Sequence, residues 1–185
     1  MLLRFRQRRT RRLLPRLPAL RRGHSGLLAQ MLKTNVMRLL SGAGINYTVK
    51  EYPVDESDLS ALHAVEALDI EAERVFKTLM LRGASGSYSV CCIPADMELD
   101  LKKTAKAARE KSIDLIPVKE IQPLTGYVRG GCSPVGMKKQ FSTFIDETAQ
   151  LFDTIALNAG ERGVLVVLAP EELARFIGAQ FADLT

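Results

Sequence analysis

Apolar and polar positions along the chain predict a mixture of helices and strands. Helical spacing, with apolar residues on one side, runs over 34–40, 60–68, 101–110 and 170–178. Strand-like runs, alternating or fully apolar, cover 46–52, 75–82, 88–94, 113–118, 141–146, 154–160 and 163–169. Because helices and strands mix without strict alternation, the pattern favours an α+β domain around a mixed sheet.

Two connecting segments stand out between these elements. The glycine-rich segment 83–87, GASGS, joins two apolar runs and predicts a β-hairpin. Segment 125–139, TGYVRGGCSPVGMKK, has little periodicity and predicts a long loop. Its adjacent glycines, Gly130 and Gly131, would let the backbone approach a ligand and offer consecutive N–H donors. An ordinary surface loop explains the same residues equally well.

Lys77 interrupts the apolar run VFKTLML at 75–81. An unpaired buried ammonium costs several kcal/mol or loses its proton. Three explanations remain open on the residues alone. The lysine could reach water from an edge strand, pair with a carboxylate, or face a cleft that needs positive charge.

The net charge of +5 comes from one segment. Of the 26 Lys and Arg residues, nine arginines lie in residues 1–30, which contain no acid, and this leaves 17 basic against 21 acidic residues elsewhere. The rest of the chain is mildly acidic, which argues against a broad basic surface that binds duplex nucleic acid. We expect residues 1–30 to be an Arg-rich disordered extension and residues 31–185 to form the domain. A mistaken start codon, a targeting segment and a nucleic-acid or membrane-surface arm remain alternative origins of the extension.

The cysteines and histidines limit the kinds of metal and cofactor site that the chain could form. The three cysteines, Cys91, Cys92 and Cys132, form no CxxC pair, and the only histidines are His24 and His63. We therefore expect no zinc site, and without a phosphate-binding loop or a dinucleotide fingerprint we predict no metal and no cofactor. Three reduced thiols fit a cytoplasmic protein. No apolar run reaches membrane-spanning length, so we predict no membrane association.

Five segments carry a family resemblance: RVFKTLML (74–81), LDLKKTAK (99–106), TGYVRGGCSPVGMKK (125–139), NAGERG (158–163) and LAPEELARFIGAQFADL (168–184). In this order they resemble the YbaK/EbsC family of freestanding aminoacyl-tRNA editing proteins, most of all the YbaK-type Cys-tRNA(Pro) deacylases. The resemblance covers about residues 33–185. It implies the fold of the related editing domain of bacterial prolyl-tRNA synthetases, with a mixed, mostly antiparallel, barrel-like sheet and surrounding helices.

The resemblance also implies an activity and partners. The protein would cleave the aminoacyl ester of Cys-tRNA(Pro), and by extension of Cys-tRNA(Cys), by binding the charged 3′ end of the tRNA with help from prolyl-tRNA synthetase. The substrate's own cysteine thiol would attack the ester, so no protein nucleophile is needed. An Ala-tRNA(Pro) or other mischarged-tRNA deacylase, and a non-catalytic module that binds a nucleotide or tRNA end, remain alternatives. The oligomeric state stays open.

Residue roles follow from the same resemblance. Lys77 would lie in the cleft and orient the tRNA end, while Gly130 and Gly131 would aim N–H groups at the ester carbonyl. The substrate-binding positions would be Tyr52, Phe76, Thr78, Ser133, Pro134, Asn158, Ala159 and Gly160. Asn158 replaces an expected small hydroxyl residue and Ala159 an expected glycine, which leaves the amino-acid specificity open. We interpret Cys132 as filling the loop.

Overall fold

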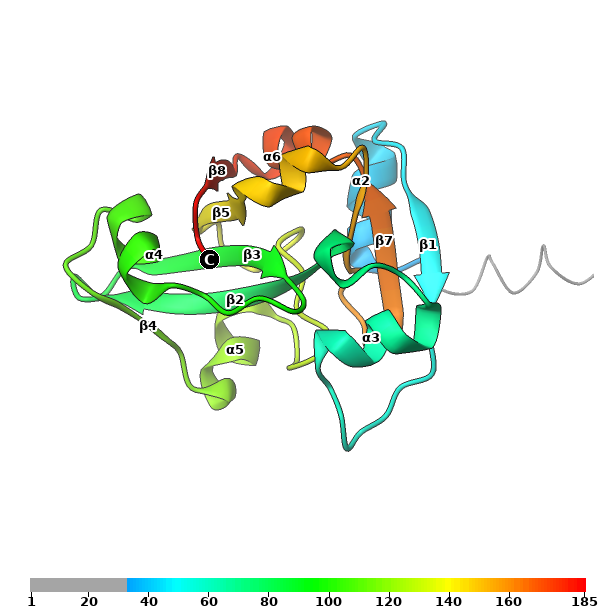
Figure 1. Ribbon diagram of the computed structural model, residues 1–185, viewed down its shortest axis with the longest axis horizontal. Helices are drawn as coiled ribbons and strands as arrows, with labels where there is room; N and C mark the ends of the chain where they lie inside the picture. The colour runs from blue at the N-terminus through cyan, green and yellow to red at the C-terminus, as the bar shows by residue number, and fades with distance from the viewer. Residues whose placement is uncertain (1–32) are drawn as a thin grey trace, which may run out of the picture. The chain divides into compact units, whose positions relative to one another are not determined.

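A long hairpin lies at the centre of the sheet. The computed structural model describes residues 33–185, so the disorder predicted for residues 1–30 lies outside the described residues. Strands β2 (Val75–Gly83) and β3 (Tyr88–Pro94) pair antiparallel along their whole length (Figure 1). The glycine turn between them confirms the predicted hairpin.

Eight strands form one mixed sheet. The others are β1 (Thr48–Glu51), β4 (Ile113–Leu115), β5 (Ser142–Asp146), β6 (Ile155–Asn158), β7 (Val164–Leu168) and β8 (Gln180–Ala182). Their order is β1-β7-β6-β2-β3-β5-β8, and β4 pairs with β2 beside this path. The β2–β3, β2–β4, β1–β7 and β6–β7 pairs are antiparallel, whereas β2–β6, β3–β5 and β5–β8 are parallel. The α+β class with a mixed, mostly antiparallel sheet is therefore confirmed, but the sheet is open rather than barrel-like, because β1 and β8 end the path without meeting.

Helices cover both faces of the sheet (Figure 1). They are α2 (Asn35–Gly42), α3 (Ala61–Leu68), α4 (Leu101–Ala107), α5 (Val118–Thr125) and α6 (Pro170–Ile177), with short 3₁₀ turns η1 (Ala72–Arg74) and η2 (Glu147–Leu151). Side-chain caps begin three of the helices, at Thr34, Ser60 and Asp100. None of the helices in residues 33–185 has the length and apolar character needed to cross a membrane.

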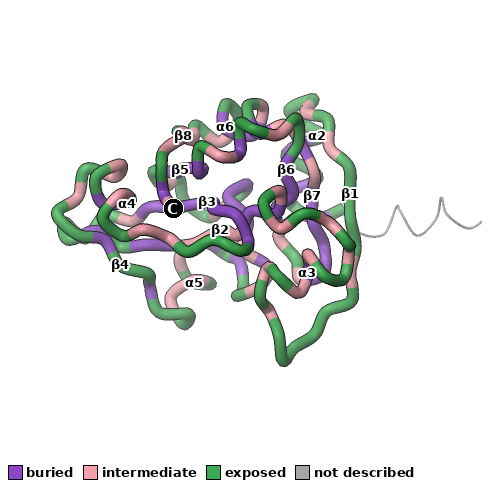
Figure 2. The backbone as a smooth tube through the Cα atoms, in the orientation of Figure 1, coloured by how far each residue is buried: buried purple, intermediate pink, exposed green. Residues whose placement is uncertain are grey.

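Alternation along β2 divides the core between the two faces, as the pleat requires. Phe76 and Met80 pack with α2, α5 and α6 on one face, which we call the α2 face. Val75 and Leu81 pack with α3 and α4 on the other, which we call the α3–α4 face. Strands β2, β3, β5, β6 and β7 contain most of the buried residues, whereas β1 is exposed and the helices expose their outer sides (Figure 2). These packed layers hold β2 in place.

Two elements differ from the sequence pattern. Segment 113–118, expected as one strand, ends its strand at Leu115, and α5 follows from Val118 to Thr125. Pro123 lies inside that helix, which is why the pattern did not suggest one; Ile121 and Leu124 still pack against the core and stabilise it. Strand β8 pairs with β5. It is only three residues long, which is too short to show an alternating pattern in the sequence.

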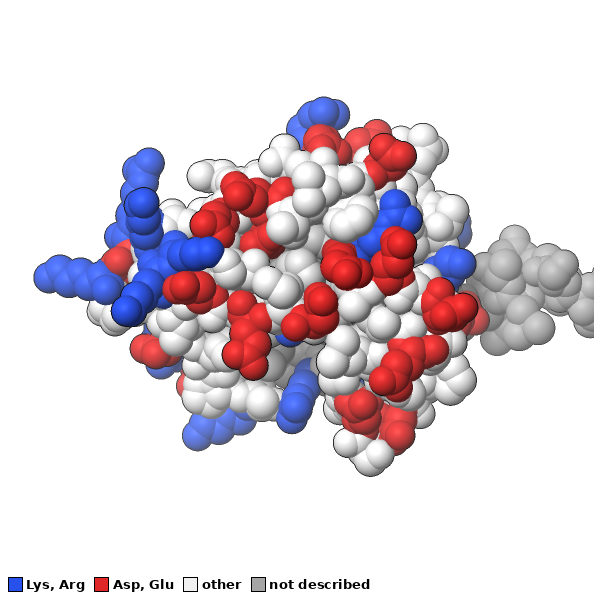
Figure 3. Space-filling view, in the orientation of Figure 1, with Lys and Arg blue, Asp and Glu red and all other residues white. Residues whose placement is uncertain are grey.

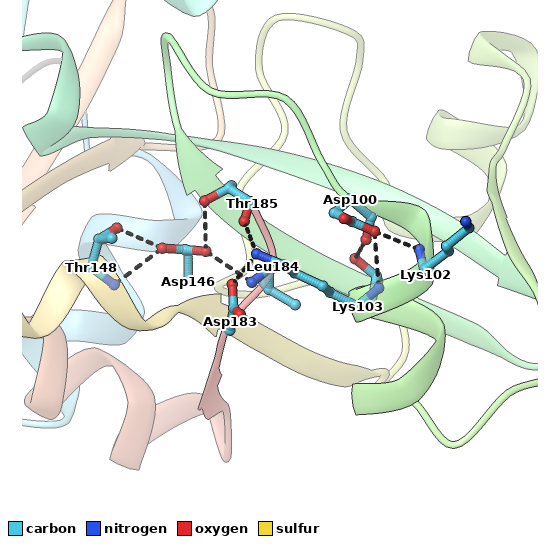
Figure 4. A network of polar contacts seen from close by, with 9 residues as sticks. Asp100, Lys102, Lys103, Asp146, Thr148, Asp183, Leu184 and Thr185 are labelled. Carbon is cyan, nitrogen blue, oxygen red and sulfur yellow. Dashed lines mark hydrogen bonds and ion pairs between the residues drawn. The ribbon is translucent and has the colours of Figure 1, made fainter.

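A buried carboxylate ties the end of the chain to the sheet. Asp146, at the end of β5, is 1% exposed. It accepts hydrogen bonds from Thr148 and from the backbone N–H of Leu184 and the hydroxyl of Thr185 (Figure 4). Lys103 on α4 pairs with Asp183 and bonds the Thr185 carbonyl. Residues 183–185 are thereby fixed against α4 and β5.

Candidate active site

The sheet has a gap beside the middle of β2. On one side β3 pairs continuously, but on the other side β6 pairs only at Val75 and Phe76, and β4 only from Leu81 to Gly83. Lys77, Thr78 and Leu79 therefore have no strand on that side, and these three are the residues of the strand's centre that are only half-buried. The surface of the α3–α4 face is hollowed between the hairpin and α3 (Figure 3). A ligand can reach β2 there.

Lys77 points to the α3–α4 face, because it alternates with Phe76. Its ammonium donates to the carbonyl oxygens of Ala95, 2.9 Å away, and Met97, 2.6 Å away. An ammonium carries three donors, so one N–H is left for another acceptor. Lys77 forms no ion pair within residues 33–185, although Asp96 and Glu98 lie close enough to act on its charge.

This environment excludes one of the three explanations for Lys77. The strand is central in the sheet, but its middle lacks a partner on one side, so Lys77 lies at a local edge. Carbonyl oxygens rather than a carboxylate hold the ammonium, which excludes a structural ion pair among the described residues. Burial lowers the pKa of Lys77, and the nearby acids Asp96 and Glu98 partly offset this effect. A half-buried cation held only by carbonyls matches the cleft explanation.

Asn158 is the last residue of β6, the strand that pairs with the start of β2. β2 and β6 run parallel with Val75 opposite Ala156 and Phe76 opposite Leu157, so Asn158 and Lys77 each follow directly after the last paired residues. The Asn158 side chain donates to the carbonyl of Gly130 at 2.9 Å and accepts from the N–H of Gly160 at 2.7 Å. One amide thus connects the strand beside Lys77 to the glycine loop.

The glycine loop presents one of its two glycine N–H groups. Gly130 has φ of 81°, where a side chain would be strained, and a Cβ would lie 3.3 Å from Leu59. Gly131 donates its N–H to the carbonyl of Val128, 3.0 Å away, and so closes a turn. Within the described chain the N–H of Gly130 has no such acceptor. In this conformation Gly130, rather than Gly131, has a backbone donor to offer a ligand.

Two residues that the sequence did not single out hold this loop. Arg162 donates to the carbonyl of Arg129 and forms an ion pair with Glu56 at 2.7 Å, which joins three segments of the chain. Tyr127 is buried and donates from its hydroxyl to the carbonyl of Val135 at 2.6 Å. Arg162 could be noted in the sequence as the arginine of NAGERG. Its contacts with Arg129 and Glu56 could not, because they join segments far apart in the sequence.

Tyr52 lines a small pocket beside Gly130. The pocket is also lined by His63 and Arg162. Tyr52 is half-buried, burial raises its pKa, and its ring meets that of His63 edge to face. The Nε2 of His63 lies 2.9 Å from the carbonyl oxygen of Pro53. His63 therefore supports the loop before α3.

Several predicted binding positions lie away from Lys77 or inside the core. Thr78 faces the α2 face, with its hydroxyl 3.9 Å from the sulfur of Cys92. Phe76 is 2% exposed, Ser133 and Ala159 are fully buried, and Pro134 is also buried. Gly160 is half-buried and bonds Asn158. The structure therefore joins Asn158 to Gly130 and Gly160 by hydrogen bonds, whereas Phe76, Ser133, Pro134 and Ala159 are buried in the core.

The cysteines offer no activated thiol. Cys91 and Cys92 belong to opposite faces of β3, as their adjacency predicts. Burial raises the pKa of Cys91 and of Cys132 to about 12, and it raises the pKa of Cys92 as well. A thiol acts as a nucleophile in its deprotonated form, so Cys132 is inert near neutral pH. Residues 33–185 also contain no cluster of His, Cys, Asp or Glu able to hold a metal ion.

The chain is similar to known proteins over most of its length. The family model described as an aminoacyl-tRNA editing domain matches residues 57–176. EbsC of Enterococcus faecalis, whose name describes it as a candidate Cys-tRNA(Pro)/Cys-tRNA(Cys) deacylase, is 44% identical over 153 residues, which are 83% of this chain and 93% of EbsC. The uncharacterised protein YwhH of Bacillus subtilis is 26% identical over 66% of this chain and 77% of its own length.

Solved structures extend the likeness to the fold. A protein described as a candidate trans-editing enzyme for prolyl-tRNA synthetase superposes with a TM-score of 0.71 at 27% identity, covering 81% of this chain and 94% of that one. The hypothetical protein APE2540 superposes with a TM-score of 0.73 at 22% identity, covering 80% of this chain and 97% of that one. The second likeness concerns the fold alone.

Proposed function

This chain belongs to the aminoacyl-tRNA editing domain family, and on that premise we propose that it is a deacylase that removes cysteine from Cys-tRNA(Pro) and Cys-tRNA(Cys). The observation that carries the proposal is the 44% identity to EbsC over 93% of that protein's length. Editing is needed because a proline-sized pocket rejects smaller amino acids by only about 1–3 kcal/mol, so a second hydrolytic site must correct the errors.

The substrate supplies the nucleophile in this proposal. The cysteine thiol loses its proton and its sulfur attacks the ester carbonyl carbon. The carbon–oxygen bond to the tRNA then breaks, the ribose oxygen takes up a proton, and the amino acid leaves as a cyclic thioester that water opens to free cysteine. An intramolecular thiol held close to the carbonyl has a large rate advantage. The protonated cysteines and the engaged His63 support a mechanism without a protein nucleophile.

Lys77 and Gly130 have separate roles in this mechanism. The free donor of the Lys77 ammonium binds the 3′-terminal nucleotide and holds the ester in the gap beside β2. The N–H of Gly130 donates to the oxygen that becomes negative as sulfur adds to the carbonyl, which is the stage where a placed donor lowers the barrier most. Asn158 fixes the distance between the two groups through its bond to the Gly130 carbonyl.

We also propose prolyl-tRNA synthetase as a partner and the cytoplasm as the place of action. The described domain has no broad basic surface and its sequence outside residues 1–30 carries more acids than bases, so its own affinity for tRNA is expected to be weak. A synthetase that has just released the mischarged tRNA would supply the missing selectivity for that tRNA.

A deacylation panel tests the function. The substrates are Cys-tRNA(Pro), Cys-tRNA(Cys), Ala-tRNA(Pro) and Pro-tRNA(Pro), each with and without prolyl-tRNA synthetase. We expect rapid loss of cysteine from the first two and slow loss from the others. Preferential cleavage of Ala-tRNA(Pro) would replace the cysteine assignment, and binding of tRNA without cleavage of any ester would make the protein a binding module.

A further inference from the structure

A basic surface lies on helix α4, on the same face of the sheet as Lys77. Lys102 and Lys106 are four residues apart on the helix, and Arg109 and Lys111 lie in the segment that follows its end at Ala107. All four side chains are exposed. We call these four residues the α4 basic face. Lys103 is not part of it, because it turns away to pair with Asp183.

The cations of the α4 basic face are unpaired. None of the four forms an ion pair with another residue of the described domain. Acids near the helix already have partners: Asp100 caps the helix, Glu110 accepts from Ser85 and Ser87, and Asp183 pairs with Lys103. Figure 3 shows Lys and Arg side chains gathered over α4, while Asp and Glu side chains dominate the rest of this face. Such a concentration in an otherwise acidic domain attracts one local stretch of polyanion.

Lys77 and α4 lie on the same face along β2. Lys77 and Leu79 share that face, and Leu79 packs with the cluster that anchors Ala105 of α4. Leu81, a buried residue of the same cluster, lies four strand residues or about 13 Å along β2 from Lys77. A stacked single strand advances about 3.4 Å per nucleotide, so about four nucleotides span the separation of Lys77 from the part of β2 against which α4 packs. The acids Asp96 and Glu98 lie near Lys77. Positive charge would therefore bind the single-stranded RNA mainly at its two ends, at Lys77 and at the α4 basic face.

We infer that the α4 basic face binds the phosphates of the tRNA acceptor stem while its 3′ end occupies the site at Lys77. The inference rests on the proposed function for the position of the ester, but the surface itself is defined by charge and exposure alone. The inference sets the orientation of the tRNA on the domain. Its single-stranded 3′ end enters beside β2, and the first base pairs of the acceptor stem lie over α4.

The test compares two triple variants of equal charge. Lys102→Ala/Lys106→Ala/Lys111→Ala removes three cations of the α4 basic face and leaves Arg109, whose backbone φ of 57° would complicate a substitution. Lys50→Ala/Lys119→Ala/Arg175→Ala removes three exposed cations elsewhere. Binding of uncharged tRNA(Pro) is measured from low to moderate salt. We expect the slope of log Kd against log salt to fall by about 0.7–0.9 per removed contact in the first variant only.

Kinetics separate this inference from the proposed function. For Cys-tRNA(Pro), KM should rise at least about tenfold in the first variant, whereas a short cysteinylated CCA oligonucleotide should be cleaved as by wild type. If no protein cleaves either ester, the proposed function fails while the binding slopes still test the surface. Equal slopes in both triple variants and wild type would overturn the inference. So would unchanged tRNA binding with weakened binding of prolyl-tRNA synthetase, because the surface would then contact a protein.

Discussion

The ammonium of Lys77 lies 2.9 Å from the carbonyl oxygen of Ala95, the residue that follows the end of β3. Backbone just after the end of the partner strand therefore holds the lysine. Its position does not depend on the conformation of neighbouring side chains. A carboxylate in the same position would neutralise the charge. Carbonyl oxygens fix the position of the ammonium and leave its positive charge available to a substrate.

Replacing Lys77 should abolish activity without harming the fold. In Lys77→Ala we expect deacylation of Cys-tRNA(Pro) to fall at least about a hundredfold, the scale of losing one placed electrostatic contact. The free energy of unfolding should stay within about 0.5 kcal/mol of wild type or rise, because functional sites hold charges that folding does not favour. Urea unfolding and single-turnover deacylation on the same samples measure both quantities.

Lys77→Arg serves as the matched variant with the charge kept. We expect poor recovery of deacylation, because a planar guanidinium does not replace a compact ammonium between two carbonyls. A folded Lys77→Ala protein with wild-type turnover would remove Lys77 from the site.

Stability should depend on pH through Lys77 in a defined direction. Burial lowers the pKa of Lys77 in the folded protein below its ordinary value of 10.5. Between the lowered pKa and 10.5 the unfolded chain binds more protons, so raising the pH favours the folded state, and the contribution is lost as pH falls through the folded pKa. The stability of wild type relative to Lys77→Met should therefore rise as pH approaches 10.5. Urea unfolding of both proteins at several alkaline pH values measures this difference, and a constant or falling difference would contradict the assignment.

Cys132 should be dispensable for catalysis. Because its pKa is raised to about 12 and the proposed nucleophile belongs to the substrate, Cys132→Ala and Cys132→Ser should keep most of the deacylase activity. Ser-tRNA(Pro), which carries a weaker nucleophile than a thiol, should be cleaved far more slowly than Cys-tRNA(Pro). An inactive but folded Cys132→Ala protein, or a trapped covalent intermediate on the enzyme, would rule out the substrate-thiol mechanism.

Asn158 should control the position of the glycine loop. Asn158→Ala loses the bonds to both Gly130 and Gly160 and should cost about 1–2 kcal/mol of stability. Asn158→Asp keeps the acceptor for Gly160 but places a carboxylate against the Gly130 carbonyl. We expect kcat to fall in both variants, more in Asn158→Asp, as measured by steady-state deacylation. Unchanged kcat in both would show that the loop keeps its place without this side chain.

Asp146 should be a stability residue and not a catalytic one. Asp146→Ala leaves the half-buried donors of Thr148 and the buried N–H of Leu184 without an acceptor and should cost about 3–5 kcal/mol. Asp183→Ala is the control, because it removes only an exposed pairing with Lys103 and should cost less than about 1 kcal/mol. Urea unfolding measures both. Activity per folded molecule should match wild type, and a loss of turnover in stable Asp146→Ala would contradict this separation.

The local pattern of apolar and polar residues predicted most helices and strands but not how they pack together. The hairpin 75–94 and the helix beginning at Pro170 follow from periodicity, turn residues and caps, which are local signals. Helix α5 did not follow, because Pro123 argues against a helix and only packing of Ile121 and Leu124 compensates. The open sheet also depends on strand order, which pairs residues far apart in the sequence.

The candidate site was predictable in its residue types and less so in its geometry. The lysine within an apolar strand and the paired glycines drew attention to the segments from which the candidate site is built. That Lys77 and Thr78 point to opposite faces follows from strand alternation, yet the carbonyl partners of Lys77 depend on where β3 ends. The turn that occupies the N–H of Gly131, and the contacts of Arg162, arise only once distant loops come together.

The gap beside β2 has a further consequence for how the protein avoids unwanted association. An exposed strand flank invites pairing with other chains, and proteins usually cover it or shorten it. Here β6 and β4 close the flank at both ends, and the N–H and C=O groups of Lys77 and Leu79 point toward β3, so only Thr78 directs unpaired backbone groups into the gap. An opening of three residues is too short to add a strand. This flank of β2 can therefore present main-chain groups to a small ligand without offering a template for fibre growth.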